Sequence, residues 1–142
     1  MSQKELMEEL FTVLHTIKKK MYTDRVNKKH PSITLAQSRI LFLIAEQTDM
    51  SVKQLANTLQ TTSSAITQLI DGLVAQNYVQ RTESELDRRM LLISLTPHGE
   101  VELKQIKQER LAYFSSLLSC LSAEELETYV KINQKIVRSF NN

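Results

Sequence analysis

Hydroxyl and amide side chains gather in one short segment of the chain, residues 61–68, which reads TTSSAITQ. Such side chains donate and accept hydrogen bonds, and glutamine can bind the edge of adenine in the DNA major groove through two of them. The members that lie away from the apolar stripe of this segment are Thr62, Ser63, Ser64, Thr67 and Gln68. We therefore treat them as candidates for contacting base pairs, with a merely solvated helix face as the alternative.

A second group of polar residues includes Arg81, Asp87, Arg88 and Arg89. A cation near the tip of a hairpin can reach a phosphate or the narrow minor groove of DNA. The alternative is a set of surface salt bridges, each worth only about 0–1 kcal/mol when exposed. Farther upstream, Ser51 and Lys53 stand at the start of a predicted helix, where helix N-termini bind anions. Phosphate contact is thus a candidate role for both.

Residues suited to metal binding or catalysis do not assemble into a motif. His15, His30 and His98 share no metal-ligand spacing, and no Ser/His/Asp, Cys/His or paired-carboxylate pattern supports a reaction. The single cysteine, Cys120, lies among leucines, which predicts a thiol packed in a core or an interface rather than a redox sensor. We predict that the protein is not an enzyme and has no metal or cofactor.

The composition, with 42% hydrophobic and 24% charged residues among 142, is typical of a soluble globular protein. No stretch approaches the ~20 apolar residues of a membrane span, and the N-terminus lacks the apolar region of a signal peptide. One cysteine suits a reducing compartment, so we expect a cytoplasmic protein with no membrane partner. The net charge is +2, yet residues 31–96 hold five Lys or Arg against six acids. Charge alone therefore leaves open a protein-interaction adaptor that binds no DNA.

Apolar periodicity predicts the helices that position the candidate residues. Apolar residues at helical spacing predict one long helix over residues 3–28, which His30-Pro31 ends. Thr34 and Ser51, each followed three positions later by glutamine, predict the starts of the second and third helices. Residues 61–64 supply N-cap candidates for a fourth helix. The third and fourth helices, joined by a turn, form a helix-turn-helix candidate.

The second half of the chain begins with a predicted hairpin. Residues 78–81 and 90–95 are β-prone and flank the charged stretch, which makes it the loop of a "wing". Thr96-Pro97 predicts the N-cap and first residue of a long helix that ends near residue 120, and Ser122 caps a last helix. The fold class we expect is mainly α: a winged helix-turn-helix with a small two- or three-stranded β wing, plus N- and C-terminal helices that form a dimerisation region.

The order of these elements resembles that of the MarR family of bacterial regulators over essentially the whole chain. The most specific stretch is Asp87-Arg88-Arg89 followed by MLLISLTPHG. It is similar to the family's D-x-R, hydrophobic strand, L-T-x-x-G pattern at Asp87, Arg89, Leu95, Thr96 and Gly99. The segment AITQLIDGLVAQNYVQR resembles the family's recognition helix and its exit into the wing.

The resemblance implies a DNA-binding transcriptional regulator that acts as a homodimer, and we expect it to be a repressor. It assigns insertion into the minor groove to Arg89, with Asp87 orienting it. Gln68 and Gly72 depart from the arginines that the family often carries in the recognition helix. Asn77 stands where a glycine is usual at the helix exit, and asparagine tolerates the left-handed conformation of that position.

We expect a DNA-binding lobe over residues 33–98 and a helical dimerisation region made of residues 1–32 and 99–142. The alternative is a monomeric helical bundle with a hairpin insert. The basic stretch from Lys18 to Lys29 is either a solvated face or, as the resemblance allows, part of a pocket for a small anionic effector. The apolar positions expected at the subunit interface are Leu10, Ile17, Leu117, Val130 and Val137.

Overall fold

The computed structural model describes residues 1–28 and 33–140. Each helix begins where the sequence places an N-cap residue, and four of these starts are full capping boxes, at Ser2, Thr34, Ser51 and Ser122. The break expected after the first helix, at His30 and Pro31, lies outside the described residues, as does Lys29. The elements are α1 (Gln3–Asn27), α2 (Leu35–Gln47), β1 (Met50–Ser51), α3 (Val52–Thr58), α4 (Ser63–Ala75), β2 (Val79–Glu83), β3 (Leu91–Leu95), α5 (Pro97–Leu117) and α6 (Ala123–Ser139).

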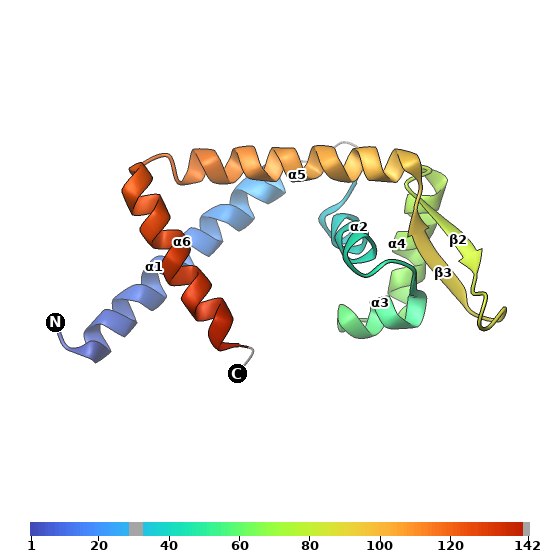
Figure 1. The fold of residues 1–142 in the computed structure, drawn as a ribbon, viewed down its shortest axis with the longest axis horizontal. Helices are drawn as coiled ribbons and strands as arrows, with labels where there is room; N and C mark the ends of the chain where they lie inside the picture. Colours follow the sequence, from blue (N-terminus) through green and yellow to red (C-terminus); the bar gives the residue numbers. More distant parts are fainter. Residues whose placement is uncertain (29–32, 141–142) are drawn as a thin grey trace.

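A winged lobe lies at one end of α5, and α1 and α6 lie at the other (Figure 1). Its sheet is antiparallel with the order β1-β3-β2, so β3 is the central strand. Ile93 of β3 pairs with Met50 on one side and with Arg81 on the other. The expected hairpin is therefore confirmed, and the two residues of β1 make the wing three-stranded.

The core of the lobe is one cluster of buried apolar residues between Ile33 and Ile106. On α4 the buried positions Ile66, Ile70 and Leu73 recur at helical spacing and form the inward face of that helix. The central strand adds Ile93, which is fully buried. Since Ile106 belongs to this cluster, the first half of α5 packs onto the lobe, and the expected boundary at residue 98 falls inside this packing.

The L-T-x-x-G motif locks the start of α5 against the exit of α4. The Thr96 hydroxyl donates to the Asn77 carbonyl at 2.6 Å and accepts from the Gly99 amide at 2.9 Å. Gly99 has no side chain because a Cβ there would lie 1.9 Å from the Tyr78 carbonyl oxygen. Asn77 adopts a φ of 61° just past α4, as the sequence predicted for a left-handed helix cap.

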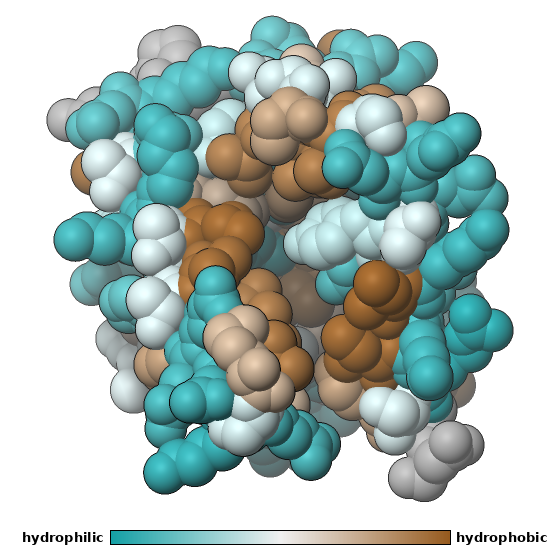
Figure 2. Space-filling view, turned by 90° about the vertical axis from the view of Figure 1, so that its left-hand side faces the viewer, coloured by the Kyte–Doolittle hydropathy of each residue, from teal (hydrophilic) through white to brown (hydrophobic). Residues whose placement is uncertain are grey.

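The helices at the other end have no core of their own. Neither α1 nor α6 buries a residue, so within the single chain these two helices do not form the core of a bundle. Viewed from this end, the molecule shows hydrophobic side chains on both sides of a hollow (Figure 2). No helix among the described residues is long and apolar enough to cross a membrane. Large apolar side chains exposed on α1 and α6 include Leu6, Leu10, Phe11, Leu14, Ile17, Leu126, Val130, Ile136, Val137 and Phe140.

Candidate nucleic-acid interface

The first turns of α4 present a row of exposed polar side chains. Thr62 caps the helix by accepting from the Ala65 amide at 3.1 Å, and the Thr67 hydroxyl donates to the Ser63 carbonyl at 2.9 Å. Within residues 1–28 and 33–140, no hydrogen-bond partner occupies the side chains of Ser63, Ser64 and Gln68. These three are consequently available to an external ligand, whereas Thr62 and Thr67 already serve the helix.

The turn between α3 and α4, which sets the direction of α4, contains a residue with a left-handed backbone conformation. Gln60 has a φ of 53°, directly after the cap of α3. The Gln60 amide donates to Asn57 and the Thr61 amide to Ala56, a pair of bonds that ends α3 as a Schellman motif does. Only glycine adopts this conformation without cost, so the turn is held in place against a local penalty.

The wing tip, residues 84–90, is closed by hydrogen bonds around a buried serine. Ser84 is 5% exposed, and its hydroxyl accepts from the amides of Leu86 (3.3 Å) and Asp87 (3.4 Å). The Ser84 amide donates to the Met90 carbonyl and the Met90 amide to the Asp87 carbonyl, each at 3.0 Å. The tip is therefore an ordered loop, and Ser84, which sequence analysis missed, is its anchor. The spacing from Ser84 to Asp87, typical of a serine-initiated turn, was the available signal.

Asp87 orients the wing in a different way from the one expected. Its carboxylate accepts from the backbone amide of Arg89 at 3.0 Å. In the described part of the chain no salt bridge joins Asp87 to the Arg89 guanidinium, nor do Glu83 and Glu85 pair with Arg88 or Arg89. Asp87 thus fixes the backbone that carries Arg89 and leaves both neighbouring guanidinium groups free of internal partners.

Arg81 has an internal partner, unlike the other two arginines. Its guanidinium forms an ion pair with the Asp71 carboxylate of α4. This ion pair neutralises an acid on α4 and occupies a cation that we had predicted to contact DNA.

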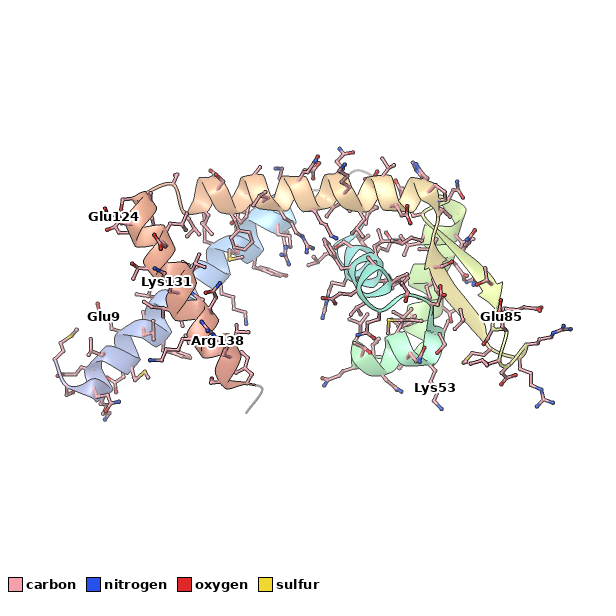
Figure 3. All side chains as sticks on the ribbon, in the orientation of Figure 1. Glu9, Lys53, Glu85, Glu124, Lys131 and Arg138 are labelled. Carbon is pink, nitrogen blue, oxygen red and sulfur yellow. The ribbon has the colours of Figure 1, made fainter. Side chains whose placement is uncertain are left out.

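Ser51 and Lys53 differ in their exposure. Ser51 is 5% exposed and uses its hydroxyl to accept from the Gln54 amide, so it serves as the cap of α3. Lys53 projects into solvent at the lower edge of the lobe (Figure 3). That edge also holds α3, the start of α4 and the wing tip, and it lies opposite α5 (Figure 1). Lys53 is therefore the better candidate for a phosphate contact.

A cavity of about 710 Å³ lies where α1, α2 and α5 meet. Apolar side chains such as Ile33, Ile106 and Phe114 line it together with the guanidinium groups of Arg25 and Arg110. Arg110 stacks 4.0 Å from the centre of the Phe42 ring. Burial, with the charge of Arg25 as a lesser cause, lowers the pKa of Arg110.

Two acidic residues, Asp24 and Glu109, also line the cavity. Among the described salt bridges none involves Arg25 or Arg110. Asp24, the acid beside Arg25, is bound instead to the Lys20 ammonium and the Tyr113 hydroxyl, each at 2.9 Å, and these bonds lower the pKa of its carboxyl. The cavity therefore combines an apolar wall with three cations, Arg25, Lys28 and Arg110, against two acids, Asp24 and Glu109. The basic stretch contributes Arg25 and Lys28 to it, and sequence analysis missed Arg110.

Metal chemistry finds no support in the part of the chain that the structure describes. Within residues 1–28 and 33–140, no three His, Cys, Asp or Glu side chains come together as a metal site. His98 stacks on Tyr78, with ring centres 4.9 Å apart. Cys120 is exposed, so the prediction of a core thiol is wrong and an interface position remains.

Known proteins provide an independent comparison. Residues 32–90 match the model of the MarR family. The HTH-type transcriptional repressor YetL of Bacillus subtilis is 30% identical over 129 residues, which cover 87% of this chain and 76% of that protein. The HTH-type transcriptional repressor MdtR of the same organism is 25% identical over 139 residues, 97% of this chain and 90% of that protein. A solved MarR family protein from Bacillus stearothermophilus shares the fold at 22% identity, with a TM-score of 0.84 and full coverage of both chains.

Proposed function

The chain belongs to the MarR family of transcriptional regulators, and on this premise we propose that it represses transcription by binding a pseudo-palindromic operator as a homodimer. Members of this family are DNA-binding regulators and not enzymes. One observation carries the proposal: the start of α4, the wing tip that carries Arg88 and Arg89, and Lys53 lie along the same edge of the lobe. The names of YetL and MdtR support repression as the mode of regulation.

Each lobe, residues 33–98, places the start of α4 in a major groove. Two such helices about 34 Å apart reach successive major grooves on one face of the duplex. Ser63, Ser64 and Gln68 face the bases, while Thr62 and Thr67 border them. Lys53 contacts phosphate, and Arg88 and Arg89 enter the flanking minor groove. Arg81 contributes less, because Asp71 already neutralises it.

Gln68 distinguishes base pairs in this arrangement. Replacing Gln68 with alanine removes a bidentate contact that is worth about 1–3 kcal/mol on the preferred site. Binding titrations on operator variants should show weaker binding together with relaxed preference at one position. An equal loss on every sequence would make Gln68 a positioning contact only.

The helical region, residues 1–32 and 99–142, joins two copies. Exposed apolar side chains on α1 and α6 support this assignment, since contiguous apolar surface marks an interaction site. We place Leu10, Ile17, Leu117, Val130 and Val137 in the interface, which would bury at least about 1,200–2,000 Å² in a stable dimer.

The cavity between α1, α2 and α5 is our candidate effector site. Its apolar wall favours an amphipathic anion, such as an aromatic carboxylate, because Arg25 and Arg110 form no described salt bridge and the lining holds three cations against two acids. A ligand there touches both α1 of the helical region and α2 of the lobe, so it can change the separation of the two lobes. If it releases DNA, it must bind the DNA-free form more tightly, by linkage. Benzoate should then weaken operator binding, benzamide should not, and Arg110→Gln should abolish the difference.

Selection of bound fragments from random duplexes tests the function as a whole. We expect an inverted repeat with half-sites about 10 base pairs apart, centre to centre. Because the lobe carries almost no net charge, the alternative function is that of a winged-helix adaptor that binds protein instead of DNA. Recovery of no enriched sequence, together with no affinity for random duplex at low salt, would favour the adaptor.

A further inference from the structure

The most exposed large apolar side chain of the winged lobe lies at the tip of the wing. Leu86 is 99% exposed and sits between Glu85 and Asp87, two residues before Arg88. A leucine side chain that is exposed to water gains none of the free energy that burial of its apolar surface would release. A hairpin loop of this kind would ordinarily carry a polar residue at that position. No described residue packs on it.

The tip presents this leucine on a prearranged backbone. The Leu86 amide donates to the hydroxyl of Ser84, and Ser84 is itself buried at the base of the loop. The Asp87 carboxylate then holds the next turn through the Arg89 amide. Because the backbone on both sides of Leu86 is bonded internally, little ordering cost remains when the tip meets a ligand.

The neighbours of Leu86 indicate what that ligand is. Arg88 and Arg89 stand beside it with no internal partner in the described chain, so the tip combines one apolar side chain with two free cations. The minor groove of DNA offers the matching surface, since its negative potential attracts arginine and its sugar walls are apolar. Proteins that bind this groove commonly place Phe, Leu, Ile, Met or Pro against it or between its base steps.

We propose that Leu86 packs into the minor groove beside Arg89 and that this apolar contact contributes to affinity independently of charge. The proposal rests on DNA binding as the function. Arginine contacts release counterions and so depend on salt, whereas burial of a leucine releases none. The two contributions of the wing are therefore separable by one variable, the salt concentration.

The test compares Leu86→Gln with wild type on the duplex enriched from random sequences, over a series of salt concentrations. We expect an affinity about tenfold lower at every salt concentration, with an unchanged slope of log K against log salt. Leu86→Met, which keeps an apolar side chain, should restore affinity to near the wild-type value. The melting temperature should not fall in either variant, because nothing in the described fold packs on Leu86.

A matched control is Val101→Gln on α5, another exposed aliphatic residue (66%) that lies outside the wing. It should leave affinity unchanged. Equal binding by wild type and Leu86→Gln would overturn the proposal while leaving the function intact, as would a loss that changes the salt slope as Arg89→Ala does. Failure of the wild type to bind any duplex would instead overturn the function on which the proposal rests.

Discussion

The winged lobe and the helical region differ in how their apolar residues are used. The lobe buries its own: the cluster from Ile33 to Ile106 closes around α4 and the sheet. At the other end of the molecule, α1 and α6 leave their apolar residues on the surface and bury none, whereas α5 buries Leu103 and Ile106 against the lobe. Apolar residues recur at helical spacing in both regions. The comparison teaches that the same sequence pattern predicts a helix face but not whether that face meets its own chain or a second copy.

The largest expected effect concerns the self-contained core. Gly99→Ala places a Cβ 1.9 Å from a backbone carbonyl oxygen that cannot move aside, so we expect a loss of about 3 kcal/mol or more in the free energy of unfolding. Urea denaturation measures it. Gly72→Ala is the control, because its Cβ would meet only the amide end of the Gln37 side chain, which can shift at the cost of its hydrogen bond to the Thr34 amide, and alanine favours the helix by about 1 kcal/mol. Equal losses in both variants would mean that the Thr96–Gly99 lock is unimportant.

The second prediction concerns a substitution that disrupts the proposed dimer interface and leaves the lobe unchanged. Val137 is 55% exposed on α6, so an aspartate there costs the single chain little. In a dimer interface this charge would be buried once in each subunit. We therefore expect the dissociation constant of the dimer to rise at least about a hundredfold. Sedimentation at micromolar concentration measures it. Thr128→Asp, nine residues earlier and on the opposite side of α6, should leave the dimer intact. A monomeric wild type would refute the assignment of the region.

The third prediction separates orientation from charge within the wing. Asp87→Ala removes the acceptor that holds the Arg89 amide, and we expect operator binding to weaken by about 1 kcal/mol although a negative charge is lost. Asp87→Asn keeps an oxygen acceptor and removes the charge, so it should bind at least as well as wild type. Tighter binding by a folded Asp87→Ala protein would show that electrostatic repulsion outweighs the orienting bond.

The smallest effect is a gain in stability at the turn between α3 and α4. Gln60→Gly relieves left-handed backbone strain of about 1–2 kcal/mol and adds about 0.5–1 kcal/mol of unfolded-state entropy. The expected net gain is about 0.5–1 kcal/mol in the free energy of unfolding. Asn77→Gly should gain less, because asparagine already tolerates this conformation. A loss in Gln60→Gly would indicate that the Gln60 side chain stabilises the turn.

Local signals in the sequence were sufficient for most of the fold. Capping boxes at Thr34, Ser51 and Ser122 located helix starts to the residue, because a cap depends only on neighbours three positions away. The site was less predictable. The pairing of Arg81 with Asp71 and the anchoring of the wing by a buried Ser84 depend on side chains that meet only after the hairpin forms. Arg110 reaches the cavity between α1, α2 and α5 for the same reason, since these helices meet only in the folded chain.

The salt dependence of DNA binding tests the central claim most directly. Wild-type protein and Arg89→Ala are titrated with the enriched duplex and with random duplex between about 50 and 200 mM salt. The account predicts that log K falls linearly with log salt for the wild type, and that Arg89→Ala reduces that slope by about one unit on both duplexes. Binding that is absent at low salt, or that does not depend on salt, would contradict the assignment of this chain as a DNA-binding regulator that acts through its wing.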